Sequence, residues 1–505
     1  MFVAKKLEVD ASHNLIVMLM EEDAKELGFQ SGERIKITNS KKKKSVICEL
    51  EIINYKKKKG SYKDINLKCG EVGLFENAFE KLESWENQIV NIILAKKPKS
   101  LEHVRNKFNG HKLHDDHFLE IMTDIVENRF SEIETTFFVL ACSVHKLDFK
   151  ETVGITNAMI KVGKTLNFKT KKNDIIVDKH CIGGIPGNRT TMVVVPIIAA
   201  AGLKIPKTSS RSITSPAGTA DTMEVLTNVS LTLSQMHKLV TEKKGCIVWG
   251  GAFDLSPADD IIIHVEHPLR LDFEVQMIAS ILSKKKAAGS THVLIDIPYG
   301  ERAKVKNYAH AKDLKKKFEK TGKAIGLEIT AIITEGFEPI GNGIGPLYEA
   351  LDVLKVLNNE ENAPADLREK SLMMAGKIIE MSGLTKKGEG YILAQEILRS
   401  GHAADKFDEI IEGQGRKKII EKGKYTIEIK AKNSGKIVKI DNRLISKLAF
   451  SLGAPQDKSA GLYLHKKLGN RIEKGETILT LYSNSKLKLK YALLYLEENE
   501  IIKIK

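Results

Sequence analysis

The sequence predicts a multidomain α/β protein. Its expected parts are an N-terminal β-barrel-like unit, a helical domain, a large α/β domain with a mainly parallel sheet, and a C-terminal α+β module. The 505 residues are long enough for about three domains. A hydrophobic fraction of 42% is sufficient for packed cores. The apolar pattern is strand-like at first, then helical, then alternating, and strand-like again near the end.

The first predicted domain covers residues 1–90. Its segments MFVAKKLEV, NLIVML, ERIKITN and SVICELEII alternate or run apolar between Gly-, Asn- and Lys-rich turns, which predicts short strands. The segment EEDAKELG predicts one short helix that ends at a glycine, the residue that most often follows a helix.

The second predicted domain, residues 91–168, is helical. Apolar residues recur at spacings of three and four in LEHVRNKFNG, DDHFLEIMTDIVENRF, SEIETTFFVLACSVHKL and FKETVGITNAMIKVGKTL. Ser131 and Glu134 have the spacing of a capping box, in which each side chain satisfies a backbone N–H of the other. A helix is therefore predicted to begin directly after Ser131.

The third predicted domain covers residues 169–425, and residues 426–505 form the fourth. The segments DIIVD, CIVWG, THVLIDIP and LEITAIIT alternate with helical stretches, which is typical of a parallel sheet. The apolar run from Met192 to Leu203 is shorter than the roughly 20 residues of a membrane span, so we expect it in the core. The final segments IKAKNSGKIVKI and GETILTLY again predict short strands.

The charge and the aromatic content of the sequence narrow the classes of binding partner to be expected. The net charge of +15 is compatible with nucleic acid, anionic lipid or small anionic substrates. Lysine runs at 41–44 and 56–59 lie between strand-like segments, which favours solvated hairpin tips, and the few aromatic residues do not interleave with basic ones as in a base-stacking surface. We therefore expect neither nucleic-acid nor membrane binding.

The five cysteines are odd in number and contain no CxxC pair, so we expect neither a structural metal site nor a disulfide framework. The N-terminal segment MFVAKKLEVD has no apolar signal core, and a reducing cytoplasm is the simplest location.

The stretch DKHCIGGIPGNRTT, residues 178–191, combines glycines with the start of a predicted helix near Thr190. A strand, a glycine turn and a helix N-terminus direct free N–H groups at an anion, and Lys179 can reach the same anion from the strand end. The spacing matches neither a Walker loop nor GxGxxG. An anion cradle and a plain tight turn explain the residues of this stretch equally well.

A second polar stretch, KTSSRSITSPAGTADTMEVL, covers residues 207–226. Its short hydroxyl side chains and Arg211 can surround an oxygen-rich ligand, whereas the alternative is a polar loop with a Ser-Pro turn. Two loops suited to oxyanions in one α/β domain strengthen the interpretation of each as part of a ligand site, because ligands bind at the carboxyl ends of parallel strands.

The third stretch, residues 269–305, contains a predicted helix with a buried stripe. Ser280 and Lys284 are spaced i, i+4 and share a face of this helix. Asp272 lies at its start and is either an N-cap or a general acid. Lys304 follows a strand and a glycine turn, so it is either a solvated loop lysine or directed into the strand-end cleft.

These three stretches resemble the thymidine and pyrimidine nucleoside phosphorylases, and more closely their archaeal AMP phosphorylase branch. The resemblance covers roughly residues 90–505, and the N-terminal β unit resembles the extension of that branch. It implies a helical domain at 91–168 with a returning helical segment at about 257–290. It also implies a cleft that closes over the substrate, and a homodimer or larger homo-oligomer.

The resemblance also implies site residues. Asp272 matches the proton donor, Lys179 a phosphate-binding lysine and Lys284 a lysine that contacts the base. The positions implied to bind nucleotide and phosphate are Gly184, Ser210, Arg211, Ser212, Ile213, Thr214, Ser215, Thr219, Ser280 and Lys304. Neither a metal nor another cofactor is implied.

The departures from the nucleoside phosphorylase pattern inform the substrate. The glycine loop carries Cys181 in place of a serine and one inserted residue, and the second loop is richer in hydroxyls. Additional donors suit the 5′-phosphate of AMP, CMP or UMP better than a 5′-hydroxyl. The expected reaction is phosphorolysis by inorganic phosphate to free base and ribose 1,5-bisphosphate. Nucleoside phosphorolysis, a phosphoribosyltransferase and a nucleic-acid-binding protein are the alternatives.

Overall fold

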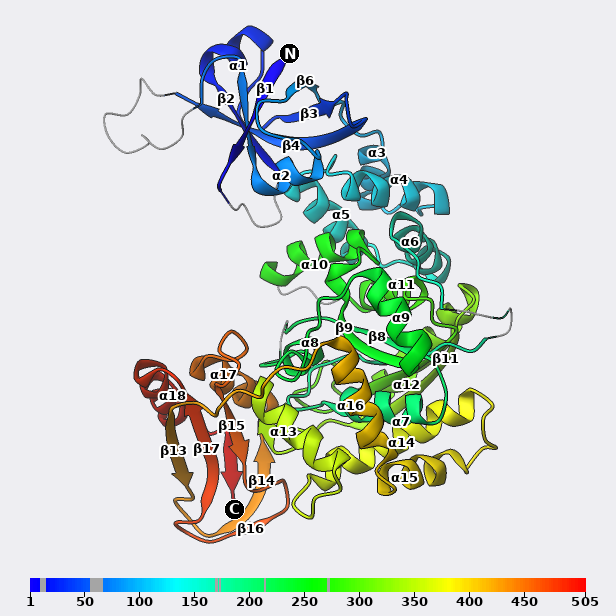
Figure 1. Ribbon diagram of the computed structural model, residues 1–505, viewed down its shortest axis with the longest axis vertical. Coiled ribbons are helices and arrows are strands. Elements are labelled where there is room, and N and C mark those ends of the chain that lie inside the picture. Colours follow the sequence, from blue (N-terminus) through cyan, green and yellow to red (C-terminus); the bar gives the residue numbers. More distant parts are fainter. Residues whose placement is uncertain (10–14, 55–66, 169–170, 172–173, 213–214, 270–272) are drawn as a thin grey trace. The chain divides into compact units, whose positions relative to one another are not determined.

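The computed structural model describes residues 1–9, 15–54, 67–168, 171, 174–212, 215–269 and 273–505 (Figure 1). The chain forms two compact units. The first contains residues 1–162 and 257–275, and the second contains residues 163–256 and 276–505. Three residues implied by the resemblance, Asp272, Ile213 and Thr214, lie outside the described residues, as does the lysine run at 56–59.

A closed barrel opens the first unit, with strand order β1-β5-β2-β4-β3-β6. Its inward side chains alternate along each strand, for example Ile35 and Ile37 on β3. The short helix ends at Gly28, whose φ of 71° is the left-handed conformation expected there. The elements are β1 (Phe2–Leu7), β2 (Ile16–Met20), α1 (Glu21–Leu27), β3 (Arg34–Asn39), β4 (Lys44–Ile53), β5 (Glu71–Phe75), α2 (Glu76–Lys81) and β6 (Ile89–Leu94).

Helices make up the rest of the first unit. The predicted capping box is confirmed: Ser131 Oγ accepts from the Glu134 N–H, and the Ser131 N–H donates to the Glu134 carboxylate. Helix α10 comes from a distant part of the sequence and packs against α4, α5 and α6. The helices are α3 (Leu101–Phe108), α4 (Asp115–Val126), α5 (Glu132–Val144), α6 (Phe149–Val162) and α10 (Pro257–Leu269).

Parallel strands begin the second unit. β7 (Val177–Cys181) pairs with β10 (His292–Tyr299), which pairs with β11 (Glu328–Glu335). β8 (Ile205–Ser209) and β9 (Gly245–Trp249) form a separate parallel pair, and one parallel bridge from Ile176 to Lys204 connects the two sheets. The carboxyl ends of β7, β8 and β10 therefore lie at one edge.

The first of these strands begins later than the predicted segment 174–178. β7 includes Asp178 and Lys179, which are fully buried. The Asp178 carboxylate accepts a hydrogen bond of 2.7 Å from Lys285 Nζ, which is 107 residues away. This partner allows polar residues within a buried strand, and the local apolar pattern does not contain that information.

Helices surround these strands, and α7 is buried along almost its entire length. Its sequence is the apolar run that was predicted to lie in the core, and the prediction is confirmed. The helices are α7 (Thr190–Ala200), α8 (Thr219–Met223), α9 (Leu233–Lys243), α11 (Glu274–Ala287), α12 (Tyr308–Ala324), α13 (Pro346–Leu357), α14 (Ala365–Met381), α15 (Gly390–Arg399) and α16 (His402–Gln414). None of the described helices has the length and apolar character needed to cross a membrane.

The C-terminal part, coloured brown to red in Figure 1, combines antiparallel strands with two helices. Its four-stranded sheet includes β12 (Gly343–Ile344), so Ile344 contributes to the C-terminal core. The remaining elements are β13 (Tyr425–Lys430), β14 (Gly435–Ile440), α17 (Asn442–Leu452), β15 (Gly461–Leu464), β16 (Arg471–Ile472), β17 (Thr477–Ser483), α18 (Lys486–Glu498) and β18 (Ile502–Ile504).

Candidate active site

The glycine loop connects the end of β7 to the start of α7 at Thr190, as predicted. Gly184 has a φ of 91°, a backbone conformation that residues other than glycine rarely adopt. A Cβ on Gly184 would lie 3.1 Å from the backbone nitrogen of Lys304. The absence of a side chain therefore lets the glycine loop approach the turn that carries Lys304.

Lys304 lies in a tight turn after β10. The Gly300 N–H donates to Val305 O at 2.9 Å, and the Ala303 N–H donates to Gly300 O at 3.0 Å. The predicted order of strand, glycine turn and lysine is thus correct. The structure brings Lys304 and Gly184, two of the residues implied to bind nucleotide, to the same place.

Lys179 directs its ammonium toward the N-terminus of α7. Its Nζ donates to Thr190 Oγ1 at 2.7 Å and to Thr191 Oγ1 at 3.3 Å, and the side chain is fully buried. Burial lowers the pKa of Lys179, while the nearby Cys181 and Asp296 oppose this effect. An ammonium, the hydroxyl of Thr191 and a helix N-terminus form a donor set suited to a phosphate, while the Thr190 hydroxyl donates to Asn188.

The carboxylate of Asp296 lies in the same buried region, at the centre of β10. Burial alone raises the pKa of Asp296, but the ammonium groups of Lys370 and Lys179 lower it below its usual value. Lys370 Nζ lies 3.2 Å from the carboxylate, and Thr334 Oγ1 donates to it at 2.6 Å. Asp296 thus partly balances the positive charge beneath the glycine loop.

The hydroxyl-rich loop folds tightly on itself. A Cβ on Gly218 would lie 2.6 Å from the carbonyl carbon of Arg211, so this approach requires glycine. Asp221 Oδ2 accepts from the Ser212 N–H at 2.7 Å and from the Gly218 N–H at 2.9 Å, which closes the loop. Ser212 Oγ donates to Ser215 O, and Ser215 Oγ donates to Ala217 O at 2.8 Å, while Ser210 is exposed.

Arg189 joins the two loops. Its guanidinium donates to Thr219 Oγ1 and to Ala217 O, each at 2.9 Å, and its Nε pairs with the buried Glu349. Thr219, one of the residues implied to bind nucleotide, therefore contacts the last residue before α7. Sequence reasoning did not single out Arg189, although a basic residue in an anion-binding loop was a usable signal.

Arg211 forms a charged network in the hydroxyl-rich loop. Its guanidinium makes a two-pronged pair with Glu224 at 2.7 and 2.9 Å and lies over the ring of Trp249, 5.1 Å from the ring centre. Hydrogen bonds from Arg211 and Lys458 lower the pKa of Glu224 to about 2 against the opposing effect of burial. Sequence reasoning also missed Asp221 and Glu224, which lie near the end of the same stretch, within one helical turn of each other.

Ser280 and Lys284 lie on α11, both half-buried. Their neighbour Lys285 is buried and pairs with Asp178 at 2.7 Å, so α11 is fixed to the strand that carries Lys179. Both Ser280 and Lys284 belong to the same compact unit as the two loops. The returning segment itself divides after Val275, because residues 257–275 belong to the other unit.

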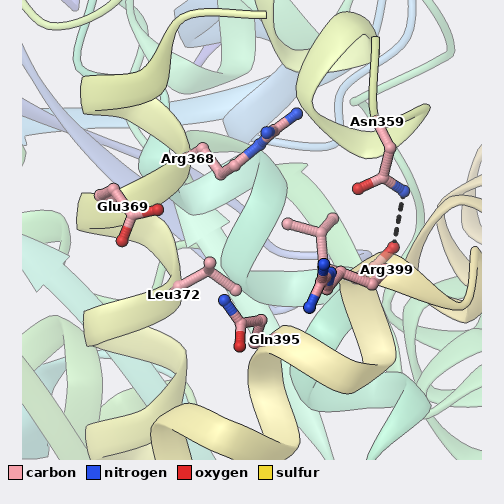
Figure 2. A pocket seen from close by; sticks show the side chains of 7 residues that line it. Asn359, Arg368, Glu369, Leu372, Gln395 and Arg399 are labelled. Atoms are coloured by element: carbon pink, nitrogen blue, oxygen red, sulfur yellow. Dashed lines mark hydrogen bonds between the residues drawn. The ribbon is translucent and has the colours of Figure 1, made fainter. Parts of the chain in front are cut away.

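A pocket of about 370 Å³ lies elsewhere in the second unit (Figure 2). Its walls come from α14, α15 and the turn after α13, and none of its lining residues belongs to the two loops. The residues are Asn359, Arg368, Glu369, Leu372, Gln395, Leu398 and Arg399. Within the described residues, no three or more His, Cys, Asp or Glu side chains are grouped as metal ligands.

Three family models match successive parts of the chain. The helical bundle domain of a glycosyl transferase family matches residues 101–163, and its a/b domain matches residues 173–404. The pyrimidine nucleoside phosphorylase C-terminal domain matches residues 436–503. A relative from Legionella pneumophila strain Paris, named "Putative thymidine phosphorylase", is 42% identical over 99% of this chain and 94% of its own length.

The chain belongs to the pyrimidine nucleoside phosphorylase family. "Putative thymidine phosphorylase 1" from Acidovorax sp. strain JS42 is 43% identical over 92% of this chain and 88% of its own. Anthranilate phosphoribosyltransferase from Thermus thermophilus is similar in fold, with a TM-score of 0.52 and 18% identity over 62% of this chain and 98% of its own. That structural similarity concerns the fold alone, whereas the family models and the relatives confirm the resemblance to phosphorylases at the family level.

Proposed function

We propose that this protein catalyses the phosphorolysis of nucleoside 5′-monophosphates, AMP first and CMP and UMP as well. Inorganic phosphate is the second substrate, and the products are the free base and ribose 1,5-bisphosphate. The observation that carries the proposal is the contact of Arg189 with Thr219 and Ala217, because it holds the glycine loop and the hydroxyl-rich loop together.

The glycine loop supplies the binding site for inorganic phosphate. Lys179 contacts the hydroxyls of Thr190 and Thr191 at the N-terminus of α7. An oxygen of the bound phosphate attacks the anomeric carbon of ribose as the C–N bond to the base breaks. Fixing both reactants in this orientation contributes a large part of the rate enhancement, because it replaces the entropy cost of an encounter in solution.

The hydroxyl-rich loop binds the nucleotide. Arg211 and the hydroxyl of the exposed Ser210 are donors matched to the 5′-phosphate, and Gly184 and Lys304 approach each other at the neighbouring strand ends. Ser280 and Lys284 on α11 complete the base and sugar contacts. Asp272 donates a proton to the departing base nitrogen, which takes the electron pair of the broken bond, since a neutral base leaves more readily than its anion.

Phosphorolysis of thymidine is the second candidate, and the names of the relatives favour it. The two activities differ in whether the substrate carries a 5′-phosphate. Incubating the protein with AMP and inorganic phosphate, and following the phosphorus resonances by NMR, tests the first candidate. We expect two new phosphate environments from ribose 1,5-bisphosphate, whereas release of base without phosphate consumption would contradict phosphorolysis.

We also propose that the protein acts in the cytoplasm as a homodimer or larger homo-oligomer, without a metal or other cofactor. The resemblance to the phosphorylase family supports this proposal. Measuring the mass in solution by light scattering, and the activity after treatment with EDTA, tests it. A monomer with full activity, or loss of activity on chelation that added metal restores, would contradict it.

A further inference from the structure

The C-terminal part of the chain reaches the hydroxyl-rich loop through one side chain. Lys458 Nζ lies 2.9 Å from Glu224 Oε2 and 3.3 Å from Asp221 Oδ1. Arg211 contacts the same two oxygens, at 2.7 and 3.3 Å. Two cations from different parts of the chain therefore share two carboxylates.

The Arg211 guanidinium can pair either with Glu224 or with a phosphate group. In the network it makes a two-pronged pair with Glu224, and a phosphate group has the same complementarity to this fork as a carboxylate. A nucleotide phosphate must therefore compete with Glu224 for Arg211. The side chain of Arg211 is 36% exposed, so it is accessible for that exchange.

The two carboxylates need a cation when Arg211 leaves. Asp221 is only 4% exposed, and it also closes the loop through the Ser212 and Gly218 N–H groups. An uncompensated buried charge is strongly unfavourable. Lys458 is already in contact with both carboxylates, so one cation stays beside them without further movement of the chain.

We propose that Lys458 is a positioning residue of the nucleotide site, which remains as the cation beside Glu224 and Asp221 when Arg211 turns to the phosphate of the substrate. This inference rests on the proposed function, because it assigns a residue to recognition of the 5′-phosphate. It makes the C-terminal part of the chain a determinant of nucleotide affinity.

The first test is AMP binding by calorimetry to Lys458→Met. We expect its Kd to rise about tenfold, the change typical of losing one charge-assisted contact. Lys466→Met is the matched control, since Lys466 is 28% exposed against 27% for Lys458 and pairs with Glu476 within the same part of the chain. Wild-type affinity in Lys458→Met would overturn the inference.

A second substitution separates positioning from direct binding and from loss of structure. Glu224→Gln removes the competitor for Arg211, so the variant Glu224→Gln/Lys458→Met should recover part of the affinity that Lys458→Met loses, because Asp221 is then the remaining carboxylate of the pair. Lys458→Arg should also retain wild-type affinity. If Glu224→Gln fails to restore binding, or weakens it in the otherwise wild-type chain, the proposed exchange is wrong.

Fluorescence of Trp249 reports on Arg211 directly. Trp85 and Trp249 are the two tryptophans of the chain, so Trp85→Phe leaves Trp249 alone. We expect AMP to change its emission as Arg211 leaves the ring, and Arg211→Met to abolish the change. A wild-type protein that does not bind AMP would contradict the proposed function. AMP binding without an emission change would contradict only the movement of Arg211.

Discussion

The guanidinium of Arg189 donates a hydrogen bond of 2.9 Å to Thr219 Oγ1 and so joins the glycine loop to the hydroxyl-rich loop. The same guanidinium pairs with Glu349, whose side chain is fully buried. Burial raises the pKa of Glu349, and Arg189 opposes that shift. One residue thus supports both the geometry of the site and a buried charge.

We predict that Arg189→Met lowers the free energy of unfolding by about 3–5 kcal/mol, because Glu349 loses its partner. Arg189→Lys keeps the positive charge but loses the guanidinium that donates to both Thr219 and Ala217. The protein should therefore fold, while its KM for nucleotide rises about tenfold. Urea unfolding and initial rates measure these effects. Arg129→Lys is the control and should change neither, because the Arg129 side chain is 43% exposed and a lysine keeps its charge beside Asp124.

Replacing Lys179 with Met should raise the KM for phosphate by about tenfold or more, because the ammonium is the charged donor at the N-terminus of α7. Steady-state rates at varied phosphate measure the change. Lys204→Met removes another lysine with a carboxylate partner, Asp174, and should leave the KM for phosphate unchanged. An unchanged KM in Lys179→Met would place the phosphate elsewhere.

The pH dependence of phosphate binding should also report on Lys179. Burial lowers its pKa below the ordinary value of 10.5, so the ammonium loses its proton at a lower pH than an exposed lysine. Phosphate binding should weaken as the pH rises through this lowered pKa. Calorimetric titration with phosphate over this range should show the loss in wild type and not in Lys179→Met.

Gly184→Ala should lower kcat/KM by about tenfold or more, because its Cβ would press on the Lys304 backbone. Gly202→Ala is the matched control: its φ is 89°, close to the 91° of Gly184, but no atom lies within 4 Å of its Cβ. In both variants, backbone strain should lower the free energy of unfolding by about 1–2 kcal/mol. Only Gly184→Ala should lose more activity than its loss of stability explains. Equal kcat/KM values for the two variants would contradict a role for the close contact between Gly184 and Lys304.

Asp272→Asn should reduce turnover by roughly 10²–10⁴-fold with little change in nucleotide affinity, as expected for loss of a general acid. Single-turnover rates and calorimetric Kd values separate the two effects. Asp254→Asn, at an exposed ion pair with Lys164, is the control. Wild-type turnover in Asp272→Asn would leave Asp272 as a helix cap.

Local signals in the sequence were sufficient for much of the fold. The capping box at Ser131, the glycine that ends α1 and the start of α7 at Thr190 each depend on a few neighbouring residues, and all are confirmed. Their physical causes are short-range hydrogen bonds and backbone preferences. The apolar run in α7 was likewise sufficient to place it in the core.

Long-range partners explain what the sequence did not reveal. Asp178 in β7 pairs with the distant Lys285, and the C-terminal sheet includes β12 from a preceding segment. In the site, the parallel-strand pattern placed Lys304 near the strand ends, where it approaches Gly184, but it left a solvated loop lysine as the alternative. The junction at Arg189 and the pairing of Arg211 with Glu224 depend on side-chain directions that a linear pattern does not specify.

The central claim is that the substrate carries a 5′-phosphate. The most direct measurement compares kcat/KM for base release from AMP and from thymidine, in parallel reactions with and without inorganic phosphate. We predict phosphate-dependent release of adenine with a kcat/KM at least about 10²-fold above that for thymidine, since unsatisfied phosphate donors in the site penalise a nucleoside. Phosphate-dependent release of thymine that is faster than release of adenine would contradict the claim.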